Sequence, residues 1–195
     1  AHIGTEPLEA GLNILGAHID SPRLDLKQNP VYENNGFAFL DTHYYGGIKH
    51  YQWVTLPLAL HGMVAKTDGT VVDVNVGDDA GDPVFCVTDL LPHLGNQQMA
   101  KKGSEVVEGE NLDVLIGNRP LKVEPADDAS DEEKAAAKEP VKAFALKLLE
   151  EKYGIAEEDF LSAEIEVVPA GRARELGFDR SMVIGYGQDD RVCAY

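Results

Sequence analysis

The sequence has few cysteines, few basic residues and no long apolar run. Its two cysteines, Cys86 and Cys193, lie far apart and share no short metal-binding spacing, which argues against a disulfide framework or a cysteine-based zinc finger. Lysine and arginine total 17 against 34 acidic residues. Phosphate binding depends on clustered cations, so we expect no nucleic-acid partner. No stretch approaches the roughly 20 apolar residues of a membrane span, so we expect no membrane partner and a cytoplasmic protein.

The composition is otherwise that of a globular protein. Hydrophobic residues make up 44% of the 195 residues, enough for a substantial core. This length suits one domain, or one domain with a piece of another. Because the sequence opens on Ala1 and closes on Tyr195 without a helix cap or a polar tail, we expect both ends to be cut.

The middle of the chain has the pattern of an antiparallel sheet. From residue 31 to residue 87, aromatic and β-branched runs are separated by turn residues. Asp68 and Gly69 lie between two such runs, 61–65 and 70–76, and Asp-Gly accepts the positive φ of a hairpin turn. Residues 112–118 predict a further strand and turn.

A helix follows in the last third of the chain. Ser130 and Glu133 have the spacing of a capping box, so the acidic run 127–133 predicts a loop that leads into a helix. After Pro140, apolar residues recur at helical spacing until Gly154, which predicts a helix over 140–153. Residues 163–168 alternate as a half-exposed strand does.

Two polar segments could carry chemistry. Residues 12–16 predict a short buried strand that leads into His18 and Asp20, two residues apart and hence on the same side of an extended chain. Active sites of open α/β sheets lie beyond the carboxyl ends of strands. The acids Asp189 and Asp190 follow an apolar segment, 182–184, in the same way. A carboxylate can bridge two metal ions about 3.5–4 Å apart. Taken separately, the His18-Asp20 pattern is more often a surface or capping pair, and adjacent acids such as Asp189 and Asp190 are usually part of a turn or a helix start.

Together these segments resemble the aspartyl aminopeptidase and vacuolar aminopeptidase I-like zinc metallopeptidases. The similarity is strongest over residues 16–27 and continues at 45–47, at 180–181 and at Asp189. It implies that His18 is a metal ligand, that Asp20 orients His18, and that Asp189 bridges two ions. The resemblance also implies two zinc ions in each full-length subunit, with cobalt or manganese as alternatives. Ile19, where the family more often has threonine, leaves the preferred substrate open.

The resemblance also implies a domain organisation. Residues 1–25 and 177–195 would be an α/β catalytic-domain fragment, and residues 26–176 an inserted β-rich (α+β) dimerisation domain. Dimers of this family assemble into dodecamers, in which a loop of the insert reaches a neighbouring subunit. Residues 91–94 resemble that loop, so His93 is expected to contact substrate there.

The implied activity is removal of N-terminal residues from peptides, and the resemblance suggests specificity for acidic ones. The family completes its site with a Glu-Glu pair, a further Asp and a late His, all expected after Asp189 and outside the sequence. We therefore expect this chain alone to be inactive. Two alternatives stay open: a non-catalytic oligomerisation module, and a related two-metal deacylase or carboxypeptidase.

Overall fold

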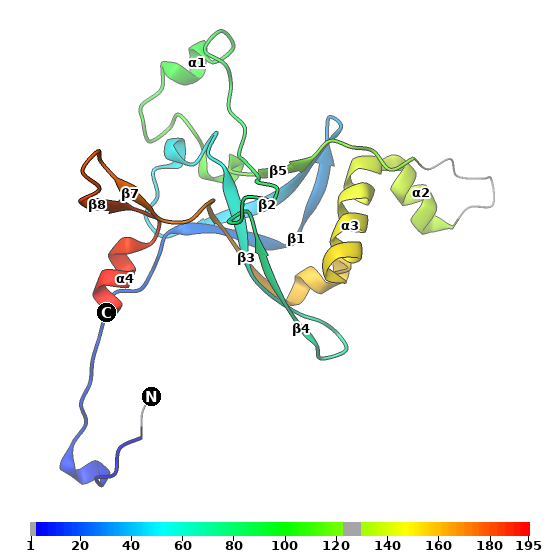
Figure 1. Ribbon diagram of the computed structural model, residues 1–195. Helices are drawn as coiled ribbons and strands as arrows, with labels where there is room; N and C mark the ends of the chain where they lie inside the picture. Colours follow the sequence, from blue (N-terminus) through cyan, green and yellow to red (C-terminus); the bar gives the residue numbers. More distant parts are fainter. Residues whose placement is uncertain (1–2, 123–129) are drawn as a thin grey trace. The chain divides into compact units, whose positions relative to one another are not determined.

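The computed structural model of the protein describes residues 3–122 and 130–195 (Figure 1). The chain divides into two compact units. The small unit comprises Ala1–Ser21 and Gly187–Tyr195, and the sheet unit comprises Pro22–Tyr186. This division follows packing, and the expected role of residues 26–176 as an inserted dimerisation domain stays a prediction. No helix of the described residues is long and apolar enough to cross a membrane.

The sheet unit is built on a curled antiparallel sheet, as the sequence predicted (Figure 1). Its six strands run in the order β4-β3-β6-β1-β2-β5, and β7 and β8 form a separate two-stranded hairpin. The strands are β1 (Arg23–Asn34), β2 (Phe37–Tyr45), β3 (Leu58–Ala65), β4 (Val71–Val76), β5 (Val114–Gly117), β6 (Ala163–Pro169), β7 (Arg174–Leu176) and β8 (Met182–Ile184).

The β3–β4 hairpin confirms the turn predicted at Asp68 and Gly69. Gly69 has a φ of 85°, a conformation that glycine adopts without steric cost. The Asp68 carboxylate accepts hydrogen bonds from the backbone N–H and the hydroxyl of Thr70. These bonds hold the pKa of Asp68 below its usual value. The turn therefore fixes the register of the two strands, in which Ala65 pairs with Val71.

A proline and a glycine shape two irregular places in the sheet. The register of β1 against β2 shifts between Leu26 and Val31, and Pro30, which has no N–H to donate, lies in this bulge. At Gly62 of β3 a side chain is sterically excluded, because an ideal Cβ atom would lie 2.0 Å from the carbonyl oxygen of Glu164 in β6. The glycine therefore permits the close pairing of β3 with β6.

The helices are α1 (Asn96–Met99), α2 (Asp131–Lys138), α3 (Pro140–Tyr153) and α4 (Gln188–Ala194). The predicted capping box of Ser130 and Glu133 is present at the start of α2. The predicted helix 140–153 is confirmed as α3, which ends at Gly154 in the left-handed conformation. The carboxylate of Glu33, on β1, accepts hydrogen bonds from the first two free N–H groups of α3, those of Val141 (2.8 Å) and Lys142 (3.1 Å).

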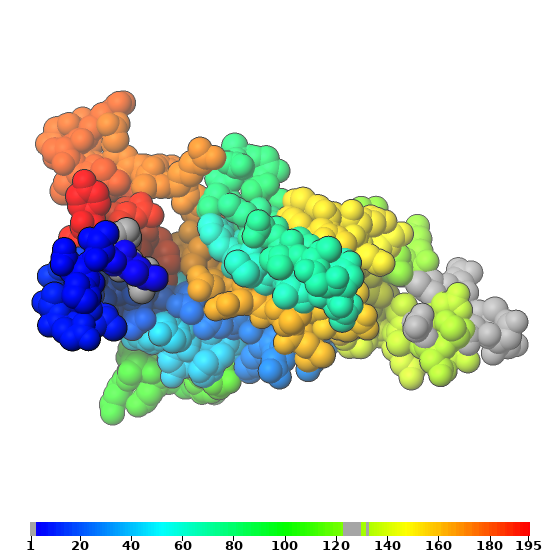
Figure 2. Space-filling view, turned by 90° about the horizontal axis from the view of Figure 1, so that it is seen from below, coloured from blue at the N-terminus to red at the C-terminus, as the bar shows by residue number. Residues whose placement is uncertain are grey.

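The core lies between one face of the sheet and α3, which packs against β1, β2 and β5. Along β6, Ile165 and Val167 are buried in this core, whereas Glu164, the residue before Ile165, is exposed. This confirms the predicted alternation. The largest fully buried side chains include Leu24, Leu58, Leu112 and Ile155. Figure 2 shows α3, in yellow, next to the turquoise β3–β4 hairpin.

The strand predicted at residues 12–16 is wrong. The structure assigns no strand to this segment, and its apolar side chains are exposed, with 96% of Leu15 accessible. A strand forms only when its N–H and C=O groups pair with a neighbour, and no pairing is found for this segment among the described residues. The strand predicted at 182–184 is present as β8, but Asp189 and Asp190 lie in the first turn of α4.

Candidate metal centre

Three potential metal ligands gather in the small unit. His18, Asp189 and Asp190 each offer one ligand atom, and these atoms all lie within 4.8 Å of one another. His18 comes from the irregular segment before Ser21, and the two acids from the first turn of α4. Gly187 precedes α4 with a φ of 72°, and an added Cβ atom there would lie 3.3 Å from the hydroxyl of Ser21. The glycine therefore lets the start of the helix approach the segment that carries His18.

Asp190 is the most buried member of this cluster. Only 7% of its surface is exposed, and its Oδ2 atom accepts a hydrogen bond from the hydroxyl of Ser21. The other oxygen, Oδ1, is buried without a hydrogen-bond partner. Nε2 of His18 lies 3.3 Å from it, a contact that is an ion pair only when the imidazole is protonated.

A buried carboxylate oxygen without a partner is costly, by about 1–3 kcal/mol or more for a charged group, and a bound cation removes this cost. The donor atoms suit zinc, which binds imidazole nitrogen and carboxylate oxygen and takes three protein ligands in catalytic sites. The two adjacent carboxylates also offer enough oxygens to contact a second cation. By donor chemistry and burial, the cluster fits a zinc site.

Comparison with known proteins agrees with this donor set. A model of the family described as aminopeptidase I zinc metalloprotease (M18) matches residues 1–195. The chain belongs to this family. It is 62% identical over 193 residues to the "Probable M18 family aminopeptidase 1" of Clostridium acetobutylicum, covering 99% of this chain and 39% of that protein. The resemblance identified from the segment around His18 is thereby confirmed.

Solved structures of the M18 family share the fold. The crystal structure of aminopeptidase I from Clostridium acetobutylicum matches with a TM-score of 0.81 and 60% identity, over 99% of this chain and 40% of that one. An M18 aminopeptidase from Thermotoga maritima matches with a TM-score of 0.81 and 50% identity, over 96% of this chain and 39% of that one. The chain thus spans about 40% of the length of these M18 relatives.

The structure brings two of the four predicted site residues together and leaves the other two outside the cluster. His18 and Asp189, the two predicted ligands, are brought together in the small unit. Asp20 is exposed, and the carboxylate observed beside the ring of His18 is that of Asp190. His93 is exposed in a turn of the sheet unit, ahead of α1. The roles predicted for these four residues stay predictions.

The sequence pointed to both acids, Asp189 and Asp190, but it assigned a metal-binding role only to Asp189 and gave Ser21 no role. Asp190 is next to the predicted ligand Asp189, but the pattern of the sequence could not show which of two neighbouring acids turns inward. That choice depends on the rotation of α4, since successive helical residues point about 100° apart. Ser21 directly follows the His18-Asp20 motif. Its hydrogen bond to Asp190, 169 residues further along the chain, could not be predicted from a local sequence pattern.

Proposed function

We propose that this chain forms part of a zinc aminopeptidase that removes N-terminal residues from peptides. The observation that carries the proposal is the cluster of His18, Asp189 and Asp190, with a buried carboxylate oxygen that lacks a hydrogen-bond partner. Membership of the M18 family supports it, because that family is described as zinc metalloproteases.

His18, Asp189 and Asp190 would hold the metal, with Asp189 reaching the second ion of a two-zinc centre. Cobalt and manganese remain alternatives to zinc. When bound, zinc polarises a peptide carbonyl and lowers the pKa of water. The hydroxyl of Ser21 donates a hydrogen bond to Oδ2 of Asp190, and the other oxygen, Oδ1, is the one that lies beside His18. Asp20, two residues from His18, would orient the imidazole.

The other expected properties of the whole protein belong to the same proposal. The sheet unit would mediate assembly into a homodimer and then a dodecamer, and His93 would contact the substrate of a neighbouring subunit. Exposed apolar side chains support an assembly role, since large exposed apolar patches mark interaction sites. Around His93 these are Leu90, Leu91, Leu94 and Met99. A preference for acidic N-terminal residues follows only from the sequence resemblance.

The test measures metal content and peptide cleavage of the full-length protein that contains this chain. We expect zinc to copurify, aminoacyl peptides to lose their first residue, and Asp189→Ala to remove both metal and activity. His43→Ala is the matched control, since His43 is an exposed histidine of the sheet unit whose Nδ1 lies 3.6 Å from Glu110.

Three results would contradict the proposal. Wild-type zinc content and turnover in the Asp189 variant would refute the ligand assignment. Cleavage of acyl-amino acids or of C-terminal residues, with intact N-terminal residues on all peptides, would instead indicate the deacylase or carboxypeptidase alternative. A metal-free, inactive but oligomeric wild-type protein would indicate the assembly module.

A further inference from the structure

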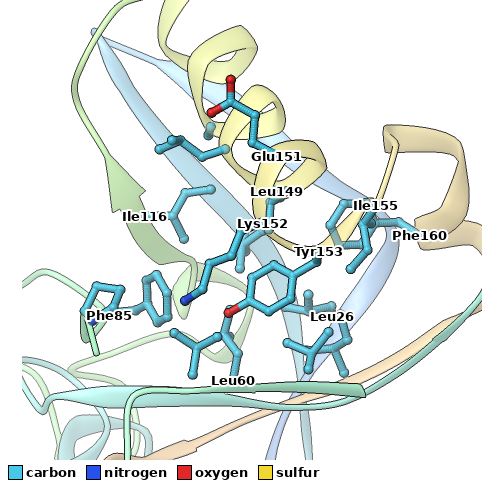
Figure 3. Close-up of a pocket in the computed structure, with 17 residues that line it drawn as sticks. Leu26, Leu60, Phe85, Ile116, Leu149, Glu151, Lys152, Tyr153, Ile155 and Phe160 are labelled. Atoms are coloured by element: carbon cyan, nitrogen blue, oxygen red, sulfur yellow. The ribbon is translucent and has the colours of Figure 1, made fainter. Parts of the chain in front are cut away.

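An apolar cavity lies inside the sheet unit, between the core face of the sheet and α3. Its volume is about 430 Å³, which is within the range of small-molecule sites, about 300–1,000 Å³. Figure 3 shows side chains from the sheet on one side and from the C-terminal half of α3 on the other. The lining is almost entirely aliphatic and aromatic, and includes Leu26, Leu60, Phe85, Ile116, Leu149 and Phe160.

The cavity follows from the way α3 covers the curled sheet. The helix packs against β1, β2 and β5, whereas Leu60, Val74 and Val76 of the β3–β4 hairpin line the far side of the cavity. One side of the cavity is open to water, since Leu148, which lines it, is 49% exposed. A small molecule can therefore reach the apolar lining from solvent.

Two residues of α3 add polar groups to the lining, the exposed Lys152 and the half-buried Tyr153. In Figure 3 the ammonium group of Lys152 and the hydroxyl of Tyr153 point into the cavity, whereas the carboxylate of Glu151 points away from it. The Lys152 nitrogen lies 5.0 Å from the centre of the Tyr153 ring. The hydrogen bond with Tyr153, and to a smaller extent the charge of Asp82, raise the pKa of Lys152.

Lys152 is available to a ligand because its acidic neighbour is held by other groups. The Asp82 carboxylate accepts hydrogen bonds from the backbone N–H groups of Gly77 (3.1 Å) and Asp79 (3.4 Å). Lys142 and Lys147, on the same helix, pair with Glu157 and Glu151, but Lys152 has no ion pair within 4.0 Å among the described residues. A single cation beside an apolar cavity complements an apolar molecule with one negative charge.

We propose that this cavity is a binding site for a small carboxylic acid with an apolar chain or ring. The apolar part lies against Leu60, Leu149 and Phe160, and the carboxylate pairs with the ammonium group of Lys152 and accepts a hydrogen bond from Tyr153. The site belongs to the sheet unit and uses none of the zinc-site residues. It goes beyond the proposed peptidase function and does not depend on it.

The test compares two ligands of equal chain length, decanoate with a charged head group and decanol with a neutral one, by calorimetric titration of the full chain. We expect Lys152→Gln to weaken decanoate binding about threefold, as for a solvent-exposed ion pair, and to leave decanol binding unchanged. Lys147→Gln, on the same helix but outside the cavity lining, is the matched control and should bind both ligands as the wild type does. Leu148→Trp fills the open side of the cavity and should weaken both ligands.

Several outcomes would overturn the proposal. It fails if the wild type binds neither ligand, if Lys152→Gln and Lys147→Gln bind decanoate equally, or if Leu148→Trp binds both ligands normally. Should Leu148→Trp fail to fold, methyl chemical shifts of the wild type decide instead. Decanoate should then shift the methyl groups of Leu60 and Leu149, and shifts confined to the exposed leucines around His93 would place binding elsewhere.

Discussion

Removing the carboxylate of Glu33 tests how α3 is attached to the sheet. Its hydrogen bonds to Val141 and Lys142 satisfy two N–H groups at the start of the helix. The helix has no other side-chain cap, because Glu139 at its N-cap position makes no such hydrogen bond. Loss of a capping side chain costs about 0.5–2 kcal/mol, and a carboxylate also interacts favourably with the helix dipole, by about 0.3–1 kcal/mol.

We therefore expect Glu33→Ala to lower the free energy of unfolding by about 2 kcal/mol, and Glu33→Gln, which retains an acceptor oxygen, by about 1 kcal/mol. For a chain of this length, 2 kcal/mol corresponds to a fall of roughly 4–8 °C in Tm. The assay is urea denaturation followed by circular dichroism. Glu139→Ala is the control, with an expected change within about 0.5 kcal/mol. Equal stability of Glu33→Ala and Glu139→Ala would refute the capping role.

Three further predictions concern the sheet and the metal centre. Gly62→Ala places a methyl group against a backbone carbonyl of β6 and should cost more than about 3 kcal/mol in thermal denaturation, whereas Gly117→Ala, with open space around it, should cost under about 1 kcal/mol; similar costs would refute the steric argument. Burial and a hydrogen bond to Asp113 raise the pKa of Tyr32 in the folded state. Above pH 10 the Tyr32 hydroxyl of the unfolded chain therefore loses its proton first, and the free energy of unfolding falls by up to about 1.4 kcal/mol per pH unit. Tyr32→Phe should make this fall with pH shallower, and an unchanged slope would contradict the argument. In the full-length protein, Asp190→Asn should lower the zinc bound per subunit measured by atomic emission, and full occupancy would exclude Asp190 as a ligand.

The sequence predicted best where local chemistry decides the structure. Asp68 and Gly69 specify a hairpin turn by themselves, and Pro140 and Gly154 mark the two ends of α3 because their preferred φ angles suit those positions. The order of the strands could not be predicted in this way. The chain places β6 between β1 and β3, and the contact that permits it, between Gly62 and Glu164, joins residues about a hundred positions apart.

The candidate site shows the same limit. The family resemblance implied that His18 and Asp189 are metal ligands, and the structure brings both into one cluster. Residues 12–16 look like a buried strand because they are apolar, yet an apolar run does not reveal whether a neighbouring strand is present to pair with it. Asp190 received no ligand role because its burial depends on the rotation of α4 and on the distant Ser21.

The geometry of the small unit suggests how zinc should change its stability. Asp190 is the only buried residue among those that the structure describes in this unit, so apolar packing contributes little to holding His18 beside α4. A metal bound by His18, Asp189 and Asp190 would cross-link two segments that are otherwise joined by polar contacts.

Because zinc binding favours the folded arrangement, it should stabilise these segments by about 2.7 kcal/mol at a free zinc concentration one hundred times Kd. Hydrogen exchange with and without zinc measures this effect. We expect zinc to slow exchange at residues 17–21 and 188–194, and to leave α3 unchanged. Asp179→Asn, an exposed acid of the sheet unit, should respond to zinc as the wild type does. Unchanged exchange of both segments at saturating zinc would show that these three residues do not hold the metal together.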